Sequence, residues 1–355
     1  MESFELGELI PGLPEELGLE CVTRLSYTTH RVAAGVCRRW RQLLQGRDFY
    51  DYRKVNGFTH KVACLVQALT SPLLAVAGEK APAAPPSYGI TVFNPVTGAW
   101  DRLGPVPKYP GGLPLFCQLA GCGGRLVVMG GWDPASYDPV RDVFVYDFVT
   151  GRWTEGTPMP EKRSFFAIGS AGGSSGRVYV AGGHDESKNA LATGWVYDVR
   201  RDEWSPLPAM SLERDECEGF VVGGEDGAGG EQFWVVSGYG TENQGGFRGD
   251  AEVYDPATGE WRHLEGAWTA GRCPRGSAGM VRSGGGVVCW GEMVGRVGSC
   301  GVVVGDRVMV AGSEYQGSTQ GFYLVEGEGQ NSKIHKVEVA EEFSGFVQSG
   351  CCVEI

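Results

Sequence analysis

The chain has 355 residues, of which 42% are hydrophobic and 57 are glycine, and its formal net charge is −12. This length suits one large domain or two ordinary ones, and so much glycine excludes a mainly helical protein, because glycine weakens helices and serves tight turns. The acidic charge argues against nucleic acid as a partner, since a nucleic-acid binder needs basic groups to replace the phosphate counterions.

Residues 9–56 have the pattern of a small helical domain. Pro14 suits the first turn of a helix, and the next two residues, both glutamate, favour the positive end of its dipole. The apolar residues Leu17, Cys21 and Leu25 then recur at positions i, i+4 and i+8, with Val22 beside them. A second helix is predicted to start near Thr28, and its stripe, in which Gly35 is a candidate break, consists of Val32, Val36, Trp40, Leu43 and Leu44. About 45 residues cannot build a large core alone, so we expect an apolar face left for a partner.

Residues 60–355 are predicted to form short β-strands in repeated units. An aromatic residue stands seven positions before a tryptophan in four places: Phe93 and Trp100, Tyr146 and Trp153, Tyr197 and Trp204, Tyr254 and Trp261. Strands that end in glycine precede these pairs at 127–131, 178–183 and 235–238. A four-stranded unit buries both faces only against neighbouring copies, so the repeat predicts a β-propeller.

The number of blades depends on the last third of the chain, where the repeat is irregular. Residues 287–291 and 308–312 both resemble the strand that ends in glycine. We therefore predict six blades, with five as the alternative. The first unit lacks an inner strand and the tail 343–353 resembles one, so the tail is predicted to complete the first blade and close the ring.

The remaining features concern compartment and cofactors. The sequence has no run of about 18 apolar residues, so no membrane helix is predicted. The acidic start, Met1 to Glu5, has no signal-peptide pattern. The 11 cysteines include no C-x-x-C pair and fit free thiols in a reducing compartment. We predict a cytoplasmic or nuclear protein, or both, with no membrane partner, no metal and no cofactor.

Both regions resemble known families. Leu13-Pro14-Glu15-Glu16-Leu17 and Val36-Cys37-Arg38-Arg39-Trp40 resemble the two ends of an F-box, although Ser26-Tyr27 stands where proline and a hydrophobic residue are usual. The later units resemble kelch repeats. Together they resemble the plant kelch-domain F-box proteins, which implies an F-box at 9–56 that docks a Skp-type adaptor and a kelch propeller at 60–355 that holds a target protein. Such a protein is the substrate receptor of a cullin–RING ubiquitin ligase and is not itself an enzyme.

Two segments resemble one subgroup of that family. Residues 213–219 and 345–351 are similar to members that target phenylalanine ammonia-lyase, and some members target response regulators of the cytokinin pathway. The resemblance implies these targets; no spacing or charge in the sequence identifies one.

Two sets of site residues are expected. The predicted adaptor-binding residues are Leu13, Pro14, Leu17, Val22, Leu25, Val36 and Trp40. The loops that enter the innermost strands and the loops that follow the second strands should emerge on one face, and the predicted target-binding residues in them are Trp132, Arg163, His184, Arg214, Tyr239 and Arg275. Such loops on a rigid scaffold usually carry recognition. The alternative is that Arg163 and Arg214 only brace neighbouring blades, and that His184 is a plain loop residue.

Two other functions are weighed against this one. A kelch scaffold could bind a partner without any ligase role. A propeller enzyme would need converging ligands or acid–base pairs, but the five histidines are scattered. Glu213, Asp215 and Glu216 are a candidate carboxylate cluster, although Arg214 between them favours a solvated loop.

Overall fold

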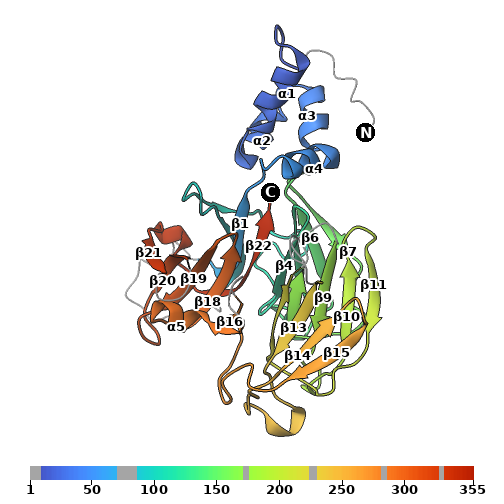
Figure 1. Cartoon of the computed structure of the whole chain (residues 1–355), viewed down its shortest axis with the longest axis vertical. Helices are drawn as coiled ribbons and strands as arrows, with labels where there is room; N and C mark the ends of the chain where they lie inside the picture. Colours follow the sequence, from blue (N-terminus) through green and yellow to red (C-terminus); the bar gives the residue numbers. More distant parts are fainter. Residues whose placement is uncertain (1–8, 70–85, 171–175, 224–229, 281–285, 328–331) are drawn as a thin grey trace.

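A computed structural model describes residues 9–69, 86–170, 176–223, 230–280, 286–327 and 332–355. Four helices form a cap at the top of Figure 1, and an all-β body lies beneath it. The last strand ends directly under the helices, so the cap and the end of the chain meet (Figure 1). None of the described helices is long and apolar enough to cross a bilayer.

The cap consists of α1 (Glu15–Thr23), α2 (Tyr27–Ala33), α3 (Arg38–Leu44) and α4 (Arg47–Val55). The predicted stripe over 32–44 is broken where Gly35 was the candidate, since a turn separates α2 from α3. Cys37 then begins α3, and its sulfur accepts a hydrogen bond from the Trp40 backbone N–H at 3.4 Å. The buried apolar cluster of this cap consists of Leu9, Val22, Ala33, Ala34, Leu43, Leu44 and Phe49.

The described residues of the body form five four-stranded antiparallel blades. The first is β22 (Val347–Glu354), β1 (Lys61–Ala68), β2 (Tyr88–Phe93) and β3 (Trp100–Arg102). The second is β4 (Gln118–Cys122), β5 (Arg125–Met129), β6 (Val143–Asp147) and β7 (Arg152–Gly156), and the third is β8 (Ala167–Ser170), β9 (Arg177–Ala181), β10 (Gly194–Asp198) and β11 (Glu203–Leu207). The fourth is β12 (Glu218–Val222), β13 (Gln232–Val236), β14 (Ala251–Asp255) and β15 (Glu260–Leu264), and the last is β18 (Val297–Val304), β19 (Arg307–Ser313), β20 (Gln320–Glu326) and β21 (Lys333–Val337).

The prediction of six blades was wrong. Between the fourth and last blades the described residues contain only the two-stranded pair β16 (Ala278–Gly279) and β17 (Val288–Cys289), followed by the short helix α5 (Trp290–Val294). Residues 287–291, which resembled a full strand, divide between β17, which has residues 288 and 289, and the start of α5 at residue 290. The physical reason is chain length, because only residues 290–296 lie between β17 and β18, too few for two outer strands. Trp290 itself is buried, 2% exposed, and packs against Gly279 and Gly301 of the inner strands.

The predicted aromatic–tryptophan pairs are confirmed as cross-strand neighbours. In each case the two residues lie directly opposite each other, as in Tyr146↔Trp153, where the ring centroids are 5.1 Å apart. The indole N–H of each later tryptophan also donates to a carbonyl in the loop that enters its blade, such as Trp153 to Gly104 at 2.9 Å. The pair therefore fixes an outer hairpin and ties it to the connection from the blade before.

The innermost strands pack closely around the axis, and each contains one glycine at the point of approach. A Cβ added to Gly121 would lie 1.9 Å from the Cys352 carbonyl oxygen, and one added to Gly219 would lie 2.6 Å from the Ile168 nitrogen. The six glycines at these positions are Gly121, Gly169, Gly219, Gly279, Gly301 and Gly350. Neighbouring backbone fills the space beside Gly121, Gly169 and Gly219, whereas the Trp290 ring fills it beside Gly279 and Gly301. Glycine is needed there because a side chain has no space.

The tail strand lies in the first blade. β22 pairs with β1 from Lys61↔Glu354 to Gln67↔Val347, and it also lies beside the inner strands β4 and β18. Trp100 of the first blade packs edge-on against Phe322 of the last blade, with centroids 5.1 Å apart. The first blade is thus built from both ends of the propeller sequence.

Candidate functional site

The predicted adaptor-binding residues divide into exposed and internal ones. Leu17 is 54% exposed and Val36 66%, and Val32 on α2 is 76% exposed. Pro14 is also exposed and Leu13 half-buried. Such apolar exposure on a small domain is typical of a protein interface.

The other three predicted residues belong to the interior of the cap. Val22 is 1% exposed. Leu25 and Trp40 pack against the same cluster, and the Trp40 indole N–H donates to the Leu9 carbonyl at 2.8 Å. These residues hold the helices together and support the exposed ones.

Polar contacts fix the cap on the propeller through α4. Arg47 donates to the Gly123 carbonyl at 2.6 Å and pairs with Asp147 at 3.0 Å. The Tyr50 hydroxyl donates to the Glu354 carbonyl at 2.9 Å, and Lys54 lies 3.3 Å from the Glu354 carboxylate. Because these contacts reach both the second blade and the tail strand, the cap is held to the body at several points.

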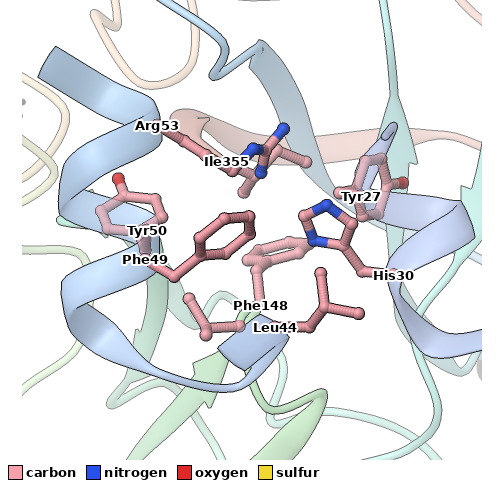
Figure 2. Close-up of a pocket in the computed structure, with 9 residues that line it drawn as sticks. Tyr27, His30, Leu44, Phe49, Tyr50, Arg53, Phe148 and Ile355 are labelled. Carbon is pink, nitrogen blue, oxygen red and sulfur yellow. The ribbon is translucent and has the colours of Figure 1, made fainter. Parts of the chain in front are cut away.

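A small pocket lies at this junction (Figure 2). The aromatic rings of Tyr27, Phe49 and Phe148 surround the His30 imidazole, and Ile355 enters from the tail. Burial, helped by the nearby charge of Arg53, lowers the pKa of His30 from 6.5 to about 4. His30 is therefore uncharged at neutral pH.

Two predicted target-binding arginines lie inside the propeller. Arg214 is fully buried and pairs with Asp250 at 2.7 Å and with Glu252 at 3.2 Å. Burial alone would raise the pKa of Asp250, but the hydrogen bond and charge of Arg214 outweigh it and lower that pKa. Arg163 is also fully buried and donates to the carbonyls of Gly182 and Thr193, each at 3.1 Å. Both side chains brace the loops of their own blades, so neither reaches a partner from this position.

His184 joins three blades in a buried chain of hydrogen bonds. The Trp132 indole N–H donates to Ser164 Oγ at 2.8 Å, and this oxygen lies 2.8 Å from His184 Nε2. His184 Nδ1 lies 2.9 Å from Asp215 Oδ1. An ionised carboxylate only accepts, so Nδ1 carries the proton and Nε2 accepts from the serine hydroxyl. His184 is a structural link, not a plain loop residue.

The Ser–His–Asp distances are those of a nucleophilic triad, but the surroundings are different. Ser164 has no exposed surface, and its oxygen is already hydrogen-bonded to Trp132. The carboxylate cluster considered above is also dispersed: Asp215 bonds to His184, Glu216 accepts from the Tyr239 hydroxyl at 3.1 Å, and Glu213 accepts from the Thr241 backbone N–H at 2.6 Å. These hydrogen bonds connect the loops to one another.

Side chains meet over the axis on the face opposite the cap. Phe116 and Phe165 lie 4.8 Å apart, and the Trp132 ring stands edge-on to both. The Arg275 guanidinium lies 4.1 Å from the Phe165 centroid and 5.9 Å from that of Phe116. We call these four residues the central plug. Trp132 and Arg275 were predicted from the sequence, whereas the two phenylalanines were missed.

A backbone signal marks the missed residues. Phe116, Phe165 and Glu216 have φ values of 60°, 57° and 49°, and Gly276 occupies the equivalent place with 65°. Each stands two residues before an inner strand. A left-handed conformation at a bulky residue is rare and costly. The repeat spacing could have identified these positions, but not the conformation that directs their side chains.

A cavity of about 630 Å³ runs among the inner strands. Its lining includes the six close-packed glycines and Glu218, whose pKa is raised by burial. The Gly276 backbone N–H donates to this carboxylate at 2.5 Å. Within the described ranges no group of three or more His, Cys, Asp or Glu could hold a metal ion.

Comparison with known proteins identifies both regions. The F-box domain model matches residues 10–52, and the kelch motif model matches residues 115–160 and 170–211. The Arabidopsis thaliana F-box/kelch-repeat protein At2g44130 is 42% identical over 303 residues, covering 80% of this chain and 72% of the relative. F-box/kelch-repeat protein At1g15670 of the same plant is 35% identical over 374 residues, covering 98% of this chain and all of the relative.

Fold and sites thus define a protein with a helical docking domain and a β-propeller. The chain belongs to the F-box/kelch-repeat proteins. Its F-box matches the described helices α1 to α4 closely, and the propeller carries the kelch repeats.

Proposed function

We propose that this protein is the substrate receptor of an SCF-type cullin–RING ubiquitin ligase. Its F-box binds a Skp-type adaptor, and its propeller holds a protein for ubiquitination and proteasomal degradation. The observation that carries the proposal is the exposure of Leu17, Val32 and Val36 on a small helical domain. The contacts of Arg47 and Tyr50 with the propeller support it, because they join the helical domain directly to the part that would hold the target.

Adaptor binding tests this function directly. Changing Leu17, Val32 and Val36 together to serine removes apolar anchors, which concentrate binding energy in interfaces. We expect adaptor affinity to fall at least about 100-fold while the melting temperature of the propeller stays constant. Val55→Ser is the matched control, since Val55 is 86% exposed on α4. Undiminished adaptor binding by the triple variant would contradict the proposal.

The predicted adaptor set has two roles under this proposal. Pro14, Leu17 and Val36 contact the adaptor, and Leu13 borders them. The role of the remaining predicted residues is to hold those contacts in place; they are Val22, Leu25 and Trp40. A kelch scaffold without ligase function remains the second candidate, and it would capture a target but no adaptor.

For the target we propose phenylalanine ammonia-lyase or a cytokinin-pathway response regulator. The support is the resemblance of residues 213–219 and 345–351 to members with those targets. In the structure both segments lead into inner strands, β12 and β22, on the face away from the F-box. Binding of each purified candidate to the full chain, followed by ubiquitination with the assembled ligase, would test this choice.

A further inference from the structure

The face opposite the F-box carries most of the exposed apolar side chains of the propeller. The described part of the propeller has seven large hydrophobic residues that are exposed, and five of them lie on this face, four in loops and Val297 at the start of β18. We call these five the apolar rim: Tyr137, Leu212, Val297, Tyr315 and Phe346. Their exposed fractions range from 36% for Leu212 to 67% for Tyr315.

The rim residues are spread around the ring. Tyr137 lies in the second blade between β5 and β6, and Leu212 in the connection from the third blade to the fourth. Val297 and Tyr315 belong to the last blade, and Phe346 precedes the tail strand of the first. A single partner that covers all five must therefore span the whole face.

The centre of the same face is already occupied by the protein's own side chains. The central plug packs ring against ring, and the Arg275 guanidinium is seated on Phe165. The Trp132 indole donates a hydrogen bond to Ser164. The Tyr239 hydroxyl donates one to Glu216, and Tyr239 is only 9% exposed. A short peptide at the axis would have to displace these contacts, and it would leave the rim uncovered.

The charge of the face opposite the F-box indicates which charge its partner should carry. Its loops contain more Asp and Glu than Lys and Arg. Several of the basic side chains are neutralised locally: Lys108 pairs with Asp142 at 2.7 Å, Lys162 with Glu186 at 2.9 Å, and Arg272 with Glu292. Asp138 and Glu242 are exposed. An acidic surface attracts a basic one and repels acidic partners.

We propose that the target is recognised as a folded domain, through a broad surface that combines apolar and basic side chains, and that it contacts the rim around the central plug. This inference deepens the proposed function and rests on it. Specific interfaces bury about 800 Å² on each partner, which a folded surface across the ring can supply. The plug supports the loops from below, and the rim supplies the anchors.

Two libraries presented to the full chain test the inference. One displays linear peptides of about 15 residues, and the other displays folded helical-bundle domains randomised over one face; a standard interface takes about 20–30 residues from each side. We expect binders from the folded library, enriched in Lys or Arg beside apolar residues, and none from the peptides at equal stringency. Linear peptides that bind more tightly, or folded binders enriched in acidic residues, would overturn the proposal.

Substitutions in the rim locate the binding. Tyr137→Ser and Tyr315→Ser should each lower the affinity of the selected domains about 10-fold, and both changes with Phe346→Ser at least about 100-fold. Val96→Ser and Ile334→Ser are the controls, since these residues are exposed elsewhere on the propeller. Binders that keep their affinity for the triple rim variant would refute the rim. Adaptor binding, measured in parallel, shows separately whether the F-box function holds.

Discussion

The second to fourth blades and the irregular segment made of residues 274–280 and 286–296 solve the same packing problem in different ways. Each regular blade fills the space between neighbours with four strands and a tyrosine–tryptophan pair. The irregular segment uses two short strands and one helix, and Trp290 packs against the glycine backbones of Gly279 and Gly301. One buried indole thus fills the space between the inner strands β16 and β18, so this part of the ring is packed without a complete blade.

The largest effect should come from the strand that joins the two ends of the ring. Removing residues from Phe346 onward deletes β22, which leaves an edge of β1 unpaired and exposes the flanks of β4 and β18. We expect loss of the cooperative melting transition of the whole propeller, followed by circular dichroism. Phe346→Ser in the full chain is the control, because this exposed residue precedes the strand. A truncated protein with an unchanged melting temperature would show that the ring does not depend on its tail.

Variants of the two buried arginines compare how much each contributes to the stability of the third and the fourth blade. Arg214→Met leaves Asp250 and Glu252 without a cation in the interior, which costs about 3–5 kcal/mol of unfolding free energy. Arg163→Met should cost less, about 1–3 kcal/mol, because its carboxylate partner Glu161 remains about one-third exposed. Urea unfolding of both variants measures the difference. Equal losses would mean that the buried acidic pair is stabilised by groups other than Arg214.

The stability that the Arg214–Asp250 pair contributes should depend on pH in one direction. Arg214 holds the pKa of Asp250 below its ordinary value of 3.8 in the folded protein. The resulting stabilisation is complete above that value and is lost as the pH falls through the lowered one. Arg214→Met should remove this acid-dependent part of the stability.

Alanine variants of two tryptophans compare directly how much the irregular segment and a regular blade contribute to stability. Trp290→Ala should cost about 3–5 kcal/mol, because the side chain is 2% exposed and fills a ring position. Trp153→Ala should cost less, since Trp153 is only half-buried in an outer strand. Thermal melting with both variants in one background tests the order. A larger effect at Trp153 would mean that the irregular segment contributes little to ring stability.

The smallest effect concerns the F-box side of the molecule. His30 has a pKa of about 4 when folded and 6.5 ordinarily, so between these pH values the unfolded chain binds more protons. Stability attributable to His30 is therefore lost as the pH falls from 6.5 toward 4, by up to about 3 kcal/mol. His30→Phe should flatten this part of the stability profile, measured by denaturant unfolding. His335→Phe is the control because that ring is largely exposed, and an unchanged profile in His30→Phe would exclude His30 as the cause.

Local pattern alone determined much of this protein. The helices over residues 15–44, the tyrosine–tryptophan hairpins and the glycine-ended strands follow from spacing, because each reflects the surroundings of a single element. The pairing of Tyr146 with Trp153 needs only one tight turn. The F-box and kelch resemblance rests on the same local features.

Only the tertiary structure decided which loop residues are exposed. Arg214 meets Asp250 and Glu252, which are 36 and 38 residues away, and this contact exists only once the fourth blade has formed. Its sequence neighbourhood is that of an exposed loop, and so is that of Arg163. The blade count was decided in the same way, because the space that Trp290 fills is set by the fourth and last blades together. Burial at such positions depends on how the ring brings distant segments together, and no local period encodes it.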